Sequence, residues 1–212
     1  MIISIVNRKG SVTKTTTTLN LAAALRDAGC SVALLDLDTQ QDLTELARRL
    51  KRVAVVPVGS DLRQTMEDIQ ADFVLIDCPP RLDTESNEGR TSLQAIALSD
   101  VCLIPTPLEY LPLRGFGRMM QTVQGIQKKY NPGLQMRVLP AIYQPSVHKT
   151  ERANLKAKYP KVLCKTNIPR STPTIHALAA GKSVLEFAPG SVAARAYRKL
   201  AREVMAWPES TP

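Results

Sequence analysis

The chain has 212 residues, of which 44% are hydrophobic, so it is not a disordered chain and can bury a substantial core, most simply as one domain over residues 1–212. Lys and Arg number 28 against 19 for Asp and Glu, giving a formal net charge of +9. This excess favours a polyanionic partner, either nucleic acid or an anionic membrane surface, although charge alone also fits an ordinary basic protein.

Short apolar, β-branched runs alternate with segments of helical periodicity along the chain. The predicted strands are residues 2–6, 31–35, 53–56, 73–76, 101–104, 136–141 and 162–166. The predicted helices are residues 15–28, 43–50, 61–70, 91–98, 115–129, 148–158 and 192–205. This alternation predicts an α/β fold with a mostly parallel sheet and helices on both faces.

The four cysteines lie far apart, without a CxxC pair or a histidine at metal-binding spacing. Three of them lie in or beside apolar runs, which predicts buried, reduced thiols. The N-terminal apolar run is too short for a signal peptide, and no segment approaches membrane-spanning length. We therefore expect a cytoplasmic protein.

A phosphate-binding pattern follows the first predicted strand. A turn leads to Lys14, Thr15 and Thr16, and the helical periodicity begins there. The start of a helix offers unpaired N–H groups and a partial positive charge to an anion. Lys14 would reach the terminal phosphates of a nucleotide, and the Thr15 hydroxyl would hold Mg²⁺. Lys9 precedes Lys14 by five residues and is not part of the ordinary P-loop pattern.

Acidic residues follow two of the apolar runs. Asp36 and Asp38 come after the second predicted strand, and Asp77 closes the run at 73–76 as a Walker B carboxylate does. Asp38 is a candidate for orienting the attacking water. Any one of these carboxylates alone would more often be a capping or solvated group, but their order with Lys9 and Lys14 favours a nucleotide site.

These motifs carry a family resemblance that runs from the first strand to the last helix. Residues 9–16 resemble the deviant Walker A box of the ParA/MinD family, usually Lys-Gly-Gly-x-Gly-Lys-Thr-Thr. Residues 36–40 are similar to the family's Asp-x-Asp-Pro-Gln, and residues 75–80 match its Walker B segment. Residues 104–115, 167–170 and 181–184 resemble three further family segments.

The resemblance implies a P-loop NTPase that hydrolyses ATP, forms an ATP-dependent sandwich homodimer and responds to a ParB-like adaptor protein. It assigns catalytic roles to Lys9, which would reach the partner's nucleotide, and to Lys14 and Asp38. It places Mg²⁺ at Thr15, Asp38 and Asp77. The nucleotide-binding residues it implies are Lys9, Gly10, Ser11, Val12, Thr13, Lys14, Thr15, Thr16, Asn167, Pro169 and Arg170. For Asn167, an ordinary turn at a strand exit remains an open alternative.

The sequence departs from the family pattern at several places. Ser11 and Thr13 replace glycines of the phosphate loop, and a β-branched residue at position 13 is expected to resist left-handed backbone angles and weaken nucleotide binding. Thr39 replaces a proline, which predicts a looser loop around Asp38. The loop Arg81–Arg90 is longer than usual and could contact a partner protomer or adaptor, or be a tolerated insertion.

Basic residues crowd the C-terminal third of the chain. Arg195, Arg198, Lys199 and Arg202 fall on one face of the last predicted helix, opposite an apolar stripe of Ala193, Tyr197, Leu200, Ala201 and Val204. For any single charge a solvated helix face is the simpler explanation. With Arg170 and Lys182, the cluster predicts non-specific binding to DNA phosphates and a nucleoid-associated protein.

The preferred interpretation is a small ParA-type ATPase that partitions plasmids or chromosomes, with slow hydrolysis. A MinD-like membrane binder is the first alternative, but residues 205–212 hold two prolines and a glutamate, so no stable membrane association is expected. A relative with an iron–sulfur cluster between protomers would need positioned cysteines such as Cys78 and Cys102. A degenerate, non-hydrolysing nucleotide scaffold also fits Ser11 and Thr13.

Overall fold

The structure is a computed structural model that describes residues 1–8, 13–48, 53–59, 61–108 and 114–208. Its described strands form a six-stranded sheet in the order β3-β2-β4-β1-β5-β6, and every pairing is parallel. The strands are β1 (Ile2–Ile5), β2 (Val32–Asp36), β3 (Ala54–Val55), β4 (Phe73–Asp77), β5 (Val101–Pro107) and β6 (Gln135–Ala141). The predicted α/β class with a parallel sheet is therefore confirmed.

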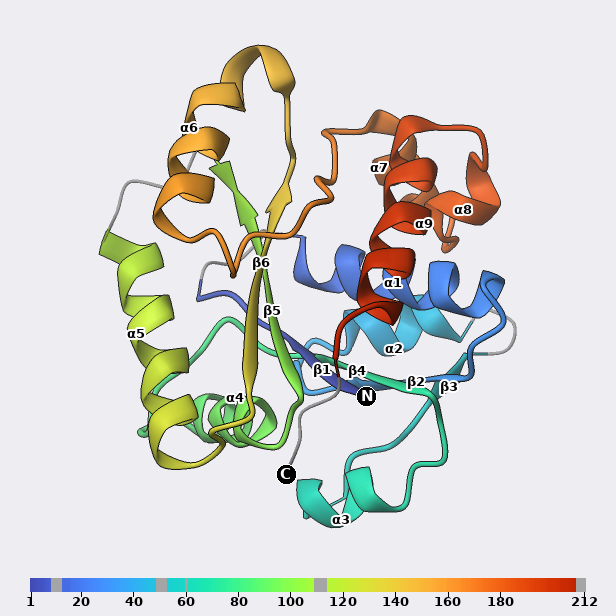
Figure 1. The fold of residues 1–212 in the computed structure, drawn as a ribbon. Helices are drawn as coiled ribbons and strands as arrows, with labels where there is room; N and C mark the ends of the chain where they lie inside the picture. The colour runs from blue at the N-terminus through green and yellow to red at the C-terminus, as the bar shows by residue number, and fades with distance from the viewer. Residues whose placement is uncertain (9–12, 49–52, 60, 109–113, 209–212) are drawn as a thin grey trace.

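Helices cover both faces of this sheet (Figure 1). On one face lie α1 (Lys14–Asp27), α2 (Asp42–Ala47), α7 (Thr172–Ala179), α8 (Val184–Phe187) and α9 (Val192–Met205). On the other lie α3 (Leu62–Glu67), α4 (Asn87–Ala97), α5 (Arg114–Lys129) and α6 (Pro145–Lys158). Each face has its own buried apolar cluster, which explains why the central strands read as nearly continuous hydrophobic runs.

The last helix packs on the first through the apolar stripe that the sequence predicts. Tyr197, Leu200, Ala201 and Val204 are buried in the cluster that α1 shares. Asn20 of α1 adds a polar link, because its Oδ1 accepts the Val184 N–H of α8 at 2.7 Å. The helix that begins at the phosphate loop is thus held between the sheet and α8–α9.

The predicted strand at 162–166 is wrong. Its contact with β6 is one bridge between Val138 and Leu163, flanked by two backbone hydrogen bonds. Beyond it, the Glu203 carboxylate of α9 accepts the N–H groups of Lys165 and Thr166, at 2.7 and 2.8 Å. These amides are therefore bonded to a side chain instead of a neighbouring strand, and no further strand forms.

The sequence pattern missed two short helices and the first turns of α4 and α6, the latter beginning at Pro145 instead of 148. Helices α7 and α8 are defined by N-caps, with the Ser171 hydroxyl on Thr174 N–H and a reciprocal capping box between Ser183 and Glu186. Helix α4 begins at Asn87 instead of 91, because the Ser86 hydroxyl accepts the Gly89 N–H. Elements this short show little periodicity, so their caps are the main signal.

The cysteines are reduced, as predicted. Cys78, Cys102 and Cys164 are buried and Cys30 is partly buried, and all four are free thiols. Burial raises the pKa of the Cys102 thiol to about 12, which keeps it protonated and unreactive. Among the helices that the structure describes, none has the length and apolar character needed to cross a bilayer.

Candidate nucleotide site

The carboxyl ends of three adjacent strands bring the predicted acids together. In the sheet register Asp36 of β2 is paired with Asp77 of β4, and Ile5 of β1 is paired with Asp77 on its other side. The segment after β1 leads to Lys14, the first residue of α1. Ligands of parallel α/β sheets bind at this edge, and the fold brings Asp36, Asp77 and the start of α1 to it.

Lys14 and Asp77 are buried, and the partly buried Thr15 is hydrogen-bonded to Asp77. Lys14 is only 8% exposed and Asp77 only 1%. The Thr15 hydroxyl donates to Asp77 Oδ2 at 2.6 Å, and the Thr18 hydroxyl lies 3.5 Å from Asp77 Oδ1. Thr18 was not singled out in the sequence, although its place three residues after Thr15 puts both hydroxyls on one helix face.

Burial decides the protonation of Asp77. Loss of solvent raises the pKa of its carboxyl from 3.8 to about 7, against the opposing effects of the Thr15 hydroxyl and the Lys14 charge. Asp36 and Asp38 raise this pKa further through like-charge repulsion. A cation bound beside these three carboxylates would relieve the repulsion.

The donor atoms at this edge are a threonine hydroxyl and carboxylate oxygens, which suit a hard cation such as Mg²⁺. Within the described ranges no cluster of three or more His, Cys, Asp or Glu residues has the geometry of a metal cage. Mg²⁺ commonly takes one or two protein ligands and fills its shell with water and phosphate oxygens, so the Thr15 hydroxyl and the neighbouring carboxylates suit it.

The loop carrying Asp38 is folded on itself. Asp38 N–H donates to Asp36 Oδ1 at 3.2 Å, and Asp38 Oδ1 accepts the Gln40 N–H at 3.1 Å. Asp36 Oδ2 accepts the N–H and hydroxyl of Thr44, at 2.8 and 3.0 Å, which anchors the start of α2. Asp38 therefore projects from a short, internally bonded turn beside Asp77.

Thr13 takes the backbone conformation that its side chain disfavours. It precedes α1 with φ 65° and ψ 21°, in the left-handed region, and its hydroxyl is buried without a hydrogen-bond partner among the described residues. The expected resistance of Thr13 to this region appears in the structure as strain, not as a different backbone path. The other loop residues of the prediction, Lys9, Gly10, Ser11 and Val12, lie outside the described residues.

Replacing Thr13 by glycine is expected to raise the free energy of unfolding by about 1 kcal/mol, because glycine adopts φ near 65° without steric strain. It also removes the unpaired buried hydroxyl. Urea unfolding measures the change. Gln41, at φ 54°, is the matched control: Gln41→Gly should stabilise similarly without touching the phosphate loop. A Thr13→Gly protein less stable than the original would contradict the strain.

The remaining predicted nucleotide residues are Thr16 and those of the segment 167–170. Thr15 and Thr16 line a hollow of about 390 Å³ between α1, α2 and Gly181. Asn167 Oδ1 accepts from Arg152 Nε at 2.6 Å, while Ile168 bonds the end of β6 and Arg170 is exposed. The structure therefore shows Asn167 held by Arg152, a residue that no site motif indicated.

The predicted basic face of α9 divides into two parts. Arg195 donates to the Gly190 carbonyl and Arg198 to the Pro189 carbonyl, the latter at 2.7 Å, so both fasten the α8–α9 turn.

Lys199 and Arg202 instead line a hollow of about 500 Å³, which we call the cationic groove. The groove also holds Lys161, Lys165 and Trp207, with Arg137 stacked 5.4 Å from the indole ring. Lys182 is exposed outside it.

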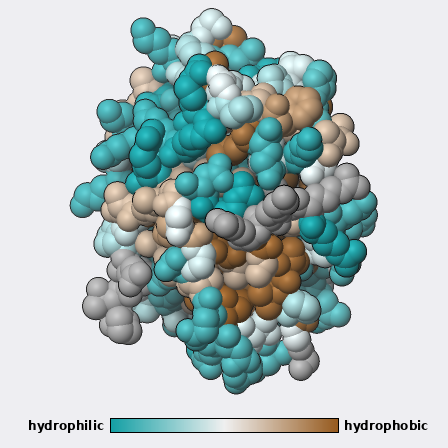
Figure 2. Space-filling view, turned by 90° about the vertical axis from the view of Figure 1, so that its right-hand side faces the viewer, coloured by the Kyte–Doolittle hydropathy of each residue, from teal (hydrophilic) through white to brown (hydrophobic). Residues whose placement is uncertain are grey.

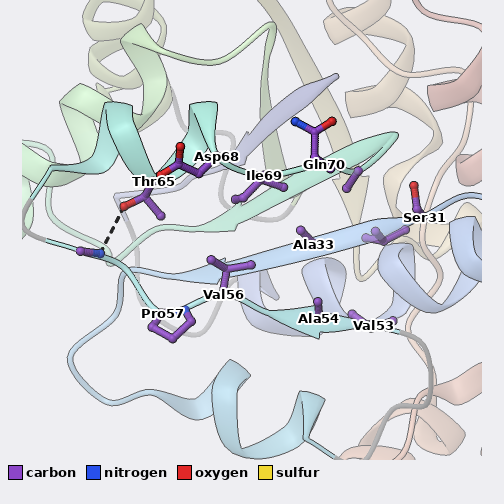
Figure 3. Close-up of a pocket in the computed structure, with 13 residues that line it drawn as sticks. Ser31, Ala33, Val53, Ala54, Val56, Pro57, Thr65, Asp68, Ile69 and Gln70 are labelled. Atoms are coloured by element: carbon purple, nitrogen blue, oxygen red, sulfur yellow. Dashed lines mark hydrogen bonds between the residues drawn. The ribbon is translucent and has the colours of Figure 1, made fainter.

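A third hollow, of about 820 Å³, contains none of the predicted residues. It lies at the β3 edge, where hydrophobic residues gather in the lower half of the face shown in Figure 2. Figure 3 shows Ala33 of β2, Ala54 of β3 and Val56, which follows β3, facing residues of the α3 region. There the Thr65 hydroxyl accepts the Gly59 N–H at 3.2 Å. Its lining is mostly apolar, in contrast to the polar edge at Asp77.

The sequence model of the CobQ/CobB/MinD/ParA nucleotide-binding domain matches residues 3–184. The chain belongs to this family. It is 30% identical to the chromosome-partitioning ATPase Soj of Thermus thermophilus over 96% of the chain and 95% of that protein. Its ParA/MinD-type resemblance, inferred above from six sequence segments, is thereby confirmed.

Solved structures of family members share the fold. MinD of Pyrococcus horikoshii, complexed with Mg-ADP, superposes with a TM-score of 0.76 at 20% identity, covering 97% of this chain and 96% of that one. Cobyrinic acid a,c-diamide synthase of Mycobacterium smegmatis, with bound ADP and magnesium, gives 0.72 at 23% identity, covering 100% and 99%. The family thus includes partitioning, division-site and biosynthetic proteins.

Proposed function

We propose that this chain is a Mg²⁺-dependent ATPase of the ParA type that forms a homodimer with ATP and binds DNA without sequence preference. The observation that supports this most directly is the Lys14–Thr15–Asp77 group at the start of α1, in which Lys14 and Asp77 are buried and Thr15 is bonded to Asp77. Its relatives include the Soj and ParA partitioning proteins, at 27–30% identity over nearly the whole chain. The cargo would be a plasmid, a chromosome or another particle, recognised through a ParB-like adaptor in the cytoplasm.

In this proposal each residue of the site has one task. Lys14 and the N–H groups at the start of α1 hold the phosphates, with Thr13 and Thr16 beside them. The Thr15 hydroxyl would bind Mg²⁺ directly, with Asp77 and Asp38 holding it through water. The ion would supply positive charge next to the transferred phosphoryl group. Asp38 orients the attacking water, Lys9 of one protomer stabilises the partner's nucleotide, and residues 167–170 lie near the adenine.

The cationic groove is the proposed DNA contact. Lys161, Lys165, Lys199 and Arg202 are exposed around it, and none of them forms an ion pair with a described acid. Arg195 and Arg198 contribute charge but also donate to backbone carbonyls, so fewer of their N–H groups are left for phosphates. Arg170 and Lys182 extend the exposed positive charge beyond the groove. Such contacts neutralise the DNA backbone without reading bases.

Light scattering with and without Mg-ATP, followed by DNA retention in both states, tests the proposal. We expect a monomer without nucleotide, and a dimer that binds duplex DNA with it. Lys165→Glu/Arg202→Glu should weaken DNA binding for every sequence and reduce the slope of log K against log salt by about 2. Lys128→Glu/Lys129→Glu, on exposed α5 positions, is the matched control. A protein that neither dimerises nor binds DNA with Mg-ATP would overturn the proposal.

A nucleotide-binding scaffold without turnover is the second candidate, supported by the left-handed conformation of Thr13. It predicts the same dimer and DNA retention, but no phosphate release with Mg-ATP. The two candidates therefore differ in a single malachite-green assay, performed with and without DNA.

A further inference from the structure

The loop that carries Asp38 is bonded to the helix that follows the Walker B strand. The Thr39 hydroxyl donates to Glu88 Oε1 at 2.6 Å, although the two residues are 49 positions apart. Glu88 Oε2 lies 3.7 Å from Arg81 Nε, so the same carboxylate also reaches the start of the segment after β4. One side chain thus connects the two loops that leave the strands of Asp36 and Asp77.

Glu88 is held firmly enough to act as an anchor. It lies in the first turn of α4, whose N-cap Ser86 donates its N–H and its hydroxyl to Asp83 Oδ1, both at 2.7 Å. These bonds lower the pKa of the Asp83 carboxyl, so it stays ionised. The next residue, Gly89, packs so closely that an added Cβ would overlap the Asp83 carbonyl oxygen. The segment 81–90 is therefore a defined turn that fixes where Glu88 lies.

Thr39 occupies the position at which the ParA/MinD family usually has proline. A proline restricts its own φ and so stiffens a loop from within. Threonine lacks that restriction but provides a hydroxyl donor, and here the hydroxyl bonds a carboxylate on another element. Hydrogen bonds to ionised acceptors are among the stronger ones, so this contact can replace the stiffness that proline would give.

We propose that Glu88 is a positioning residue for hydrolysis: through Thr39 it holds Asp38 in place for the attacking water. This inference rests on the proposed ATPase function and on the role of Asp38 in it. It gives the segment Arg81–Arg90 a role within the protomer. The sequence alone left two interpretations of this segment open, a contact with a partner or a tolerated insertion. We expect nucleotide affinity to change little when the contact is lost, because neither Thr39 nor Glu88 belongs to the phosphate loop and Thr15 and Asp77 would still hold Mg²⁺.

Steady-state kinetics separate this role from a structural one. Thr39→Val and Glu88→Ala should each lower kcat about tenfold with KM for ATP changed less than about twofold, and the double variant should lose no more than either single one. Thr39→Pro should keep kcat near that of the original protein. Adding Glu88→Ala to Thr39→Pro should then leave kcat unchanged. Thr91→Val, on the same helix with its hydroxyl on the Asn87 carbonyl, is the matched control and should leave kcat unchanged.

Hydrogen exchange gives a readout that does not need turnover. With Mg-ATP bound, Glu88→Ala should speed exchange of the amides at 37–41 while leaving those of α1 unchanged. Unchanged exchange at 37–41, or an unchanged kcat in Glu88→Ala while Asp38→Asn abolishes turnover, would overturn the inference. So would a parallel loss of kcat, nucleotide affinity and melting temperature. If Asp38→Asn itself leaves kcat unchanged, the proposed role of Asp38 fails instead.

Discussion

Lys14→Ala is expected to weaken Mg-ATP binding by about 100-fold or more, because charge-assisted bonds to phosphate are among the strongest contacts a side chain makes. Lys14 is the first residue of α1 and is only 8% exposed, so water cannot replace its ammonium group easily. Isothermal titration of the variant with Mg-ATP measures the loss. If Lys14→Ala bound Mg-ATP as tightly as the original protein, Lys14 would not be part of the nucleotide site.

Two controls separate charge from packing in this test. Lys14→Met keeps the apolar stem of the side chain and should lose affinity as fully as Lys14→Ala. Lys128→Ala removes an exposed lysine from α5 and should leave binding unchanged. Loss of affinity in Lys14→Ala but not in Lys14→Met would show that the stem matters and the charge does not.

Asp77→Asn is expected to stabilise the nucleotide-free protein at pH 8 by up to about 4 kcal/mol, since the folded state otherwise holds a buried carboxylate. The pKa is about 7 in the folded state against 3.8 normally, so the folded protein binds the extra proton. Stability of the original protein should therefore fall as pH rises from about 4 to about 7. Asparagine can still accept from Thr15 and donate to Thr18, whose own hydroxyl donates to the Lys14 carbonyl at 3.0 Å.

Urea unfolding at pH 5.5 and pH 8 in EDTA measures this effect. The original protein should be less stable at pH 8, while Asp77→Asn should be nearly equal at both values. Asp83→Asn is a control with the opposite expected effect on stability. Hydrogen bonds from Ser86 lower the pKa of the Asp83 carboxyl, so loss of this carboxylate should destabilise the protein equally at both pH values. With Mg-ATP present the advantage of Asp77→Asn should disappear, because the carboxylate then faces a cation. A variant less stable at pH 8 would contradict the raised pKa.

Most of the sheet was predictable because parallel strands buried on both faces read as apolar runs. The site followed from the same fact, since the carboxyl ends of β1, β2 and β4 meet and bring Asp36 and Asp77 into register. The predicted strand at 162–166 failed because Glu203, 37 and 38 residues away, bonds two of its amides. Local sequence holds no sign of a partner so distant.

The details of the site were less predictable for similar reasons. Side-chain branching at Thr13 argued against a left-handed backbone, but the geometry at the start of α1 enforces it. Helical spacing placed Arg195 and Arg198 on the basic face and could not show that they donate to carbonyls of the α8–α9 turn. The bond between Thr39 and Glu88 joins residues that no motif connects.

The two hydrogen bonds that Glu203 accepts from Lys165 and Thr166 also tie the end of the last helix to the backbone just before Asn167. The cationic groove and the 167–170 segment consequently share one mechanical support, since Glu203 itself lines the groove. A displacement of α9 by any bound polyanion would pull on that backbone, whereas a Glu203→Ala chain, which lacks both acceptors, would let the two regions move separately.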